Sequence, residues 1–217
     1  MATLLLRLAA PLQAWGSDSK FNIRNTEREP TKSGVIGMIA ASMGIQRNDS
    51  PELLEPLAKL KFGIRVDREG KLLKDFHMVH EYKNGKMDDS HLTTRYYLSD
   101  AVFLAGLESE NKDYLEEIVK ALNNPVYPLF LGRRSCPITL PLIIGICDEG
   151  LVDALEHASP LVNSKDSFRR IVYESDDGGR MIQDVPVSFS QLHRIHGYRY
   201  MKEKMLALEE HDPMAEL

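Results

Sequence analysis

The sequence predicts an α+β fold with a ferredoxin-like (RRM-like) domain over residues 1–150, a protruding β-hairpin within it, and a small β-rich C-terminal lobe over residues 151–217. Three observations lead to this prediction. The apolar segments of the first part follow the order strand, helix, strands, helix, strand, as in a split β-α-β arrangement. The dipeptide Asn84-Gly85 is a strong signal for a two-residue hairpin turn. After residue 150, the remaining apolar segments have the length and alternation of short strands.

The elements of the first part can be placed from apolar spacing and from capping residues. Residues 3–8 form a short apolar run and are predicted as the first strand, whereas the polar residues 17–30 are predicted as a loop. Thr31 is a plausible N-cap because apolar residues follow it at helical spacing, and Gly44 suits the end of that helix. The remaining elements are a second helix beginning after Ser109 or Asn111 and strands at residues 60–66, 101–107 and 140–147.

The predicted hairpin occupies residues 72–98 around the Asn84-Gly85 turn. Its arms are mostly polar and cannot bury much surface, so we expect the hairpin to project from the body. In the C-terminal part, the strands form either a separate lobe or an extension of the first unit. The acidic tail from Glu203 onward is predicted as a short helix. The three C-terminal strands are predicted at residues 168–174, 181–189 and 193–201.

Composition limits the class of protein. The chain has 217 residues of which 43% are hydrophobic, enough for one full core and a small second lobe. It has no apolar run long enough to span a membrane, so no membrane partner is expected. The apolar N-terminus is interrupted by Arg7 and is interpreted as a buried strand rather than a signal peptide. The two cysteines are expected to be reduced, which favours a cytoplasmic location.

The distribution of charge argues against a free-standing nucleic-acid-binding protein. The formal net charge is −5, made up of +2 in residues 1–50, −3 in residues 51–150 and −4 in residues 151–217. Affinity for nucleic acid without sequence preference rises with the number of phosphates that a protein neutralises. A modestly basic N-terminal region on an acidic body therefore suits a subunit that holds a short RNA segment within a larger assembly.

Two basic segments are candidate RNA contacts. Arg28 lies just before the first predicted helix, which Thr31, Lys32 and Ser33 open. The free N–H groups of a helix N-terminus bind anions, although a solvated loop is an equal alternative here. The second segment contains Arg133, Arg134 and Ser135 after a glycine, between the second helix and the last strand of the first part. Arginine binds phosphate with a rigid fork, and N–H groups at a glycine turn can form an anion nest, so we favour RNA binding there.

Two further features leave alternatives open. The only tryptophan, Trp15, follows the first strand and could either stack on a base or seal the edge of the core. Histidine, tyrosine and lysine side chains on the hairpin could cleave RNA without metal, with histidine as general acid or base. Their spacing carries no catalytic signal, so a protruding hairpin that inserts into a partner is the favoured interpretation. These hairpin residues are His77, His80, Tyr82, Lys83, Lys86, His91 and Arg95.

No metal and no cofactor is expected. The pairs His77/His80 and His193/His196 lie on predicted strands, where residues three apart face opposite sides of the sheet. Cys136 and Cys147 have no neighbouring ligands in the sequence, and no glycine-rich phosphate or dinucleotide motif occurs.

Four stretches of the chain, taken together, resemble the CasD family. They cover the first two-thirds of the chain, and the combination of PLQAWG, PTKSG and LGRRSCP is specific, whereas similarity beyond residue 150 is loose. The stretches are LLLRLAAPLQAWG (4–16), REPTKSGVIGMIAASMGIQRND (28–49), KDFHMV (74–79) and YPLFLGRRSCPITLPLIIG (127–145).

The resemblance implies a protein of the repeat-associated mysterious protein (RAMP) superfamily that acts in CRISPR antiviral defence. Such a protein is a non-catalytic subunit of the type I-E surveillance complex Cascade, in which it binds and caps the 5′ handle of the guide RNA (crRNA). Its hairpin, at about residues 73–98, is the thumb that packs over the guide. The implied protein partners are a CasC-type backbone subunit and a CasA-type large subunit, and target DNA is reached only through the assembled complex. Type I-C relatives cut the precursor with a tyrosine and a Lys-His pair, and this sequence has no Lys-His dipeptide.

Carried over to this sequence, the resemblance assigns site residues to three places. Two alternatives remain: a metal-independent endoribonuclease that processes precursor crRNA, and a protein scaffold in which Arg133 and Arg134 bond acidic partner residues. The residues expected to grip the handle are Thr31, Lys32, Ser33, Arg133, Arg134 and Ser135, with Arg28 and Arg47 flanking it, His77 and Arg95 at the base or arm of the thumb, and Trp15 between handle and core.

Overall fold

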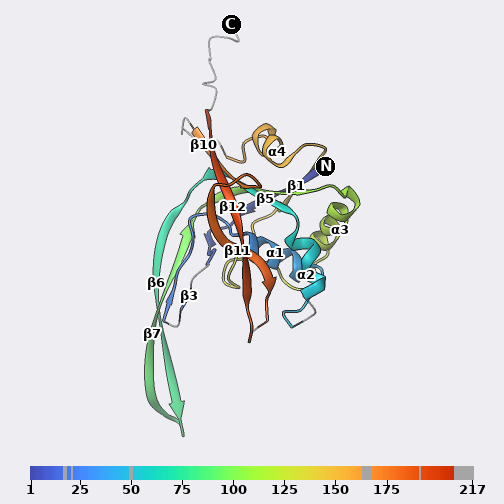
Figure 1. Cartoon of the computed structure of the whole chain (residues 1–217). Coiled ribbons are helices and arrows are strands. Elements are labelled where there is room, and N and C mark those ends of the chain that lie inside the picture. Colours follow the sequence, from blue (N-terminus) through green and yellow to red (C-terminus); the bar gives the residue numbers. More distant parts are fainter. Residues whose placement is uncertain (17–18, 21, 49–50, 163–167, 191, 208–217) are drawn as a thin grey trace.

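A seven-stranded antiparallel sheet forms the centre of the molecule (Figure 1). The computed structural model describes residues 1–217 except 17–18, 21, 49–50, 163–167, 191 and 208–217. The sheet and the helices around it confirm the predicted mixture of helices and strands. In order across the sheet, the strands are β11 (Arg180–Ser188), β12 (Ile195–Ala207), β10 (Phe168–Ser175), β5 (Lys61–Arg68), β8 (Val102–Ser109), β1 (Ala2–Ala9) and β9 (Ile143–Cys147).

The structure describes four helices: α1 (Lys32–Ser42), α2 (Pro51–Ala58), α3 (Lys112–Asn123) and α4 (Leu151–His157). The predicted N-cap Thr31 is confirmed, and of the two alternatives for the second helix, Ser109 and Asn111, the structure has Asn111 as the cap. Thr31 accepts a hydrogen bond from the N–H of Gly34 at the start of α1, and Asn111 accepts one from the N–H of Tyr114 at the start of α3. The short helices α2 and α4 were not predicted, because each is too brief to show a full helical repeat of apolar residues.

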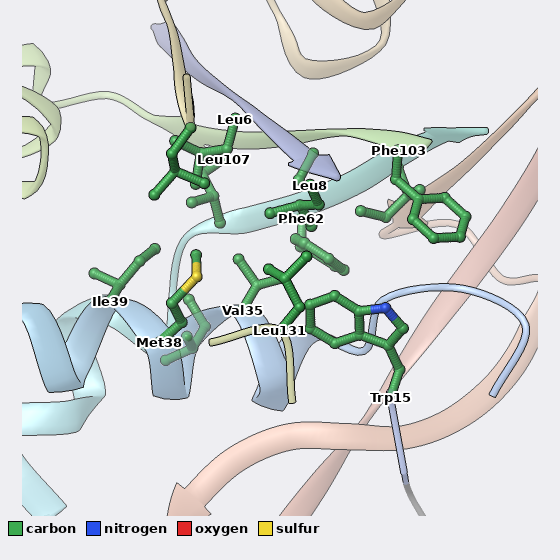
Figure 2. Packing of buried hydrophobic residues seen from close by; sticks show 14 of the residues in the cluster. Leu6, Leu8, Trp15, Val35, Met38, Ile39, Phe62, Phe103, Leu107 and Leu131 are labelled. Carbon is green, nitrogen blue, oxygen red and sulfur yellow. The ribbon is translucent and has the colours of Figure 1, made fainter. Parts of the chain in front are cut away.

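Alternation along β1 divides the core between the two faces of the sheet. Leu4, Leu6 and Leu8 belong to the larger cluster, which also contains buried residues of α1, α2 and α3. Leu5 points the other way and packs in a smaller cluster with Leu155 of α4. Figure 2 shows the larger cluster, where side chains of α1 lie below those of the central strands. The predicted first strand is therefore buried on both faces.

The C-terminal strands continue the main sheet. Residues 170–173 of β10 pair with residues 63–66 of β5, and β12 and β11 follow β10 in the sheet order. Of the two arrangements that the sequence left open, this is the extension of the first unit. The tail prediction was wrong for Glu203 and the residues that follow it as far as Ala207, because β12 runs through them and pairs with β10. The rest of the acidic tail lies outside the described residues.

A second sheet carries a long hairpin that projects from the body (Figure 1). Asn84 and Gly85 have φ of 53° and 75°, so both adopt the left-handed conformation that a type I′ hairpin turn requires. The predicted turn is thus confirmed. This sheet consists of β2 (Leu12–Gln13), β7 (Lys86–Ser99), β4 (Ile23–Arg24) and β3 (Ser19–Lys20), in that order, with β6 (Lys71–Lys83) paired to β7.

Candidate nucleic-acid interface

The pairing register gives the hairpin two different faces. Side chains of directly paired residues in an antiparallel ladder lie on the same face. Asp75 pairs with Arg95 and His77 with Thr93, so these residues share one face, which is largely polar. His77 lies beside Asp75 on the same strand, with 2.5 Å between Nε2 and Oδ2. His77 and Arg95 therefore lie on a common face of the hairpin, and their role in RNA binding stays a prediction.

The opposite face of the hairpin is apolar and exposed. Its side chains come from residues two apart on β6 and from their partners on β7. An exposed apolar face of this kind is typical of a binding surface. Because the apolar residues alternate with polar ones, the arms seemed mostly polar in the sequence. The side chains of this face are Phe76, Met78, Tyr82, Met87 and Leu92, all more than half exposed.

The loop at residues 131–136, which precedes β9, is a tight turn held by its own backbone. The N–H of Leu131 donates to the carbonyl of Cys136 at 2.8 Å, and the N–H of Cys136 donates to the carbonyl of Arg133 at 2.8 Å. Gly132 has φ of 85°, and a Cβ atom there would lie 1.6 Å from the carbonyl oxygen of Ala14. Only glycine fits this position, and the turn it permits places Arg133 against the hairpin and leaves Arg134 exposed.

Arg133 is bound to backbone carbonyl groups rather than presented to solvent. Its Nη1 donates to the carbonyl of Tyr96 at 3.0 Å, and its Nη2 donates to the carbonyls of Arg24 and Asn25 at 2.8 and 3.1 Å. The guanidinium also lies over the ring of Tyr97, 4.7 Å from the ring centroid. Contacts within the chain already engage both terminal nitrogens of Arg133, which disfavours its expected role as a phosphate contact.

Tyr97 is a central residue of the site that the sequence analysis missed. Its side chain is 3% exposed and lies on the polar face of the hairpin, opposite Leu73. Burial raises the pKa of its hydroxyl, but hydrogen bonds with Ser135, Arg133 and Arg95 outweigh burial, so the pKa lies below its usual value. The surroundings of this hydroxyl thus favour negative charge. Because residues two apart on a strand point to the same face, the position of Tyr97 two residues after Arg95 was the one signal that could have placed it there.

Three of the expected RNA contacts are accessible to solvent. Arg134 and Ser135 are exposed on the 131–136 loop, and Arg28 is exposed just before α1. Arg95 is half-buried on the hairpin, and its Nε is buried without a hydrogen-bond partner among the described residues. A buried N–H group without a partner is costly, so Arg95 can gain from an additional acceptor. The loop and the hairpin together present a small basic surface.

The start of α1 differs from expectation because a carboxylate of the chain occupies it. The N–H of Lys32 donates to Oδ2 of Asp184 at 2.8 Å, and Thr31 is buried as the N-cap. The ammonium of Lys32 is buried and bonds to Glu174 at 2.8 Å, and burial lowers the pKa of this lysine despite that partner. Thr31 and Lys32 therefore lie inside the molecule, and the anion site that the sequence suggested is already filled. Ser33 is half-buried beside them.

Trp15 and Arg47 also lie elsewhere than the handle site would need. Trp15 is 1% exposed, its indole N–H donates to Gln13, and its ring packs against Gly34, so it belongs to the core and does not stack on a base (Figure 2). Arg47 is exposed beyond the C-terminal end of α1. The 11 residues of α1 span about 16 Å. Arg28 and Arg47 therefore lie beyond opposite ends of this helix.

The described residues show neither a metal-binding cluster nor a membrane-spanning helix. Among the described residues, no three histidine, cysteine, aspartate or glutamate side chains gather as a metal ion would require. The helices in the described ranges all fall short of the length and hydropathy that a bilayer span needs. That the protein uses no metal and no cofactor stays a prediction. Its cytoplasmic location stays a prediction as well.

The fold and the site define an α+β protein with an antiparallel core, a projecting hairpin and a basic surface at its base. Residues 3–202 match the family described as CRISPR-associated protein (Cas_Cas5), and the chain belongs to this family. Over 158 residues it is 38% identical to the "CRISPR system Cascade subunit CasD" of Escherichia coli (strain K12). The matched region covers 66% of this chain and 70% of that protein. The resemblance to the CasD family that the four motifs suggested is thus confirmed.

Two solved structures share the fold over nearly the whole chain. One is described as "CRISPR RNA-guided surveillance complex", is 32% identical, has a TM-score of 0.80, and covers 95% of this chain and 90% of its own. The other is described as "Crystal structure of Cas protein", is 37% identical, has a TM-score of 0.75, and covers 94% of this chain and 95% of its own. The C-terminal strands, where the sequence similarity seemed loose, are therefore part of the shared fold.

Proposed function

We propose that this protein is a non-catalytic, RNA-binding subunit of a Cascade surveillance complex and that it caps the 5′ handle of the guide RNA. One observation carries the proposal: the basic surface where the 131–136 loop meets the hairpin, around the buried hydroxyl of Tyr97. The similarity to CasD and to a chain of an RNA-guided surveillance complex supports it. An RNA backbone is a chain of phosphates, and arginine is the side chain best suited to bind it.

The proposal includes a reading of the fold. The unit of β1, α1, β5, β8, α3 and β9 would be the ferredoxin-like domain, and the β6–β7 hairpin its thumb. The strand order β5-β8-β1-β9 and the antiparallel pairing of all four strands support this reading. The hairpin leaves the domain between β5 and β8, so both of its arms begin at central strands of the sheet.

The proposed RNA contacts follow from what is accessible. Arg134 and Ser135 would bind the handle directly, the half-buried Arg95 would add positive charge behind them, and Arg28 would lie beside them. Ser33 and His77 would be at the margin of the contact. Lys32, Trp15 and Thr31 are left out because they are buried, and Arg47 because it lies at the far end of α1.

The proposed partners use other surfaces. A CasC-type backbone subunit would pack on the apolar face of the hairpin, and a CasA-type large subunit would dock nearby. Target DNA would be reached only through the assembled complex. An acidic protein with a small basic surface needs such an assembly to retain RNA, since the proposed phosphate contacts are few.

The test is a gel-shift titration of purified protein, alone and with its backbone subunit, against a repeat-containing precursor RNA in EDTA. We expect the RNA to stay intact and the double variant Arg134→Ala/Ser135→Ala to weaken binding about tenfold or more, since a hydrogen bond to a charged group contributes about 1.5 to 3 kcal/mol. The matched control is Arg180→Ala, which removes an exposed arginine from β11 at the opposite edge of the main sheet. It should bind like the wild type.

Each other outcome has a clear meaning. Site-specific cleavage in EDTA would make this chain a metal-independent endoribonuclease, with His77 and its partner Asp75 as the first residues to examine. Equal binding by both variants and the wild type would remove the basic surface as the RNA site. It would favour a scaffold that reaches RNA only through its partners.

A further inference from the structure

The direction of the hairpin is set over a short stretch of β7. Residues 98–99 of β7 pair with β2, and Thr94 and Arg95 pair with β4. From Thr93 to the turn, the described part of the chain pairs β7 with β6 alone. We call residues 94–99 of β7 the hairpin base. Among the described residues, the strand pairing that joins β7 to the body lies within this base.

Arg133 contacts the hairpin base and connects it to two other segments. One terminal nitrogen binds the carbonyl of Tyr96 within the base, and the other binds the carbonyls of Arg24 and Asn25, where the chain leaves β4. The guanidinium also stacks on the ring of Tyr97, which is buried in the core. Arg133 itself belongs to a loop that Gly132 holds against Ala14 of the body. One side chain thus joins the body, the β4 segment and the hairpin base.

We propose that Arg133 is a positioning residue: it fixes the direction of the hairpin relative to Arg134 and Ser135 and does not itself contact RNA. The inference rests on the proposed function. Lysine cannot replace it, because one ammonium on a flexible stem cannot bind three carbonyls in fixed directions and lie flat on a ring.

Geometry explains why a small change at the base would matter. Asn84 in the turn is twelve positions along the chain from Tyr96, so the hairpin tip lies about 40 Å from the contact with Arg133 at about 3.4 Å per residue. A rotation of about 10° at the base would move the tip by about 7 Å, more than the spacing of neighbouring strands. A single guide RNA can contact the loop and the hairpin together only if this angle is narrowly distributed.

The experiment measures hairpin direction and RNA binding in the same variants. Spin labels on Lys86→Cys near the turn and Glu117→Cys on α3, both exposed positions, report the distance from hairpin to body. Cys147→Ser removes the more accessible native thiol, and Cys136 is buried. Binding to a synthetic RNA with the repeat-derived handle sequence is then titrated at several salt concentrations. Urea unfolding of each variant checks that it is folded.

Arg133→Lys and Arg134→Ala should give opposite patterns. Arg133→Lys should broaden the distance distribution and leave the salt dependence of binding unchanged. The apparent Kd should rise about tenfold if about a tenth of the molecules hold the hairpin in the direction that binds RNA. Arg134→Ala should leave the distances unchanged and reduce the slope of log K against log salt by about 0.7, the value for one phosphate of a single strand.

Three results would overturn the inference. The distance distribution of Arg133→Lys could stay as narrow as in the wild type. It could broaden without any loss of RNA affinity. A third variant, Arg133→Met, removes the charge, and a salt slope lowered as in Arg134→Ala would make Arg133 a direct phosphate contact. If the wild type does not bind the RNA at all, the proposed function fails, and the positioning role for RNA fails with it, whatever the distances show.

Discussion

Asp184 joins the start of α1 to the C-terminal strands, and its removal should destabilise the protein strongly. The carboxylate accepts hydrogen bonds from the N–H of Lys32 at 2.8 Å and from Nε and Nη2 of Arg199 at 2.6 and 2.9 Å. Asp184 is 2% exposed and Arg199 is 8% exposed. The variant Asp184→Ala would leave a buried guanidinium without its counter-ion and the first N–H of α1 without an acceptor.

The expected cost follows from this geometry. Removing one partner of a buried ion pair typically costs about 3 to 5 kcal/mol, because the other charge stays buried and uncompensated. A domain of this size is stable by about 5 to 15 kcal/mol, so the variant should lose a large fraction of its stability. The helix that carries Ser33 at its start would also lose the carboxylate that stabilises its N-terminal end.

Urea unfolding followed by circular dichroism measures this cost. The control is Asp177→Ala, which removes a carboxylate from an exposed pair with Lys202, 3.0 Å away. Asp184→Ala should unfold at a clearly lower urea concentration than the wild type, and Asp177→Ala should unfold close to it. If the two variants unfold at the same midpoint, the buried network does not stabilise the fold and the reasoning is wrong.

Two further predictions concern the basic surface. Gly132→Ala should prevent the 131–136 loop from closing and greatly reduce the yield of folded protein, because the added Cβ would lie 1.6 Å from a backbone oxygen. The control is Gly178→Ala, at a glycine with φ of 90° and open space around it. This control should fold at a cost of about 1 to 2 kcal/mol for the left-handed conformation. In an ultraviolet titration of the folded protein, Tyr97→Phe should remove a phenol that ionises below the usual pKa of 10.0, whereas Tyr114, whose pKa burial raises to about 12, should ionise late. Since the unfolded chain keeps the Tyr97 proton longer, ionisation of Tyr97 should add to stability as the pH rises from its lowered pKa to 10.0, and equal pH dependence in wild type and Tyr97→Phe would contradict this.

The local elements of this protein could be predicted well because their causes are local. Thr31 and Asn111 cap helices with their own side chains, and Asn84-Gly85 forms its turn from the conformations that these two residues prefer. The combination of three motifs was enough to place the chain in its family. The short helices α2 and α4 escaped prediction because packing against the sheet, and not a repeat in their sequence, stabilises them.

The position of each candidate side chain, in contrast, depends on partners far away in the sequence. The sequence alone determined that basic residues stand at Lys32, Arg133 and Arg134, and it predicted the same role for all three. Only the tertiary structure separated them: Lys32 meets Glu174 in the interior, Arg133 meets carbonyls of two distant segments, and Arg134 is exposed. A charged side chain that meets partners within the fold stabilises the fold, whereas one that meets none is available to a ligand. The deciding contacts, such as Lys32 with Glu174 and Arg133 with Arg24, join residues more than a hundred positions apart in the sequence.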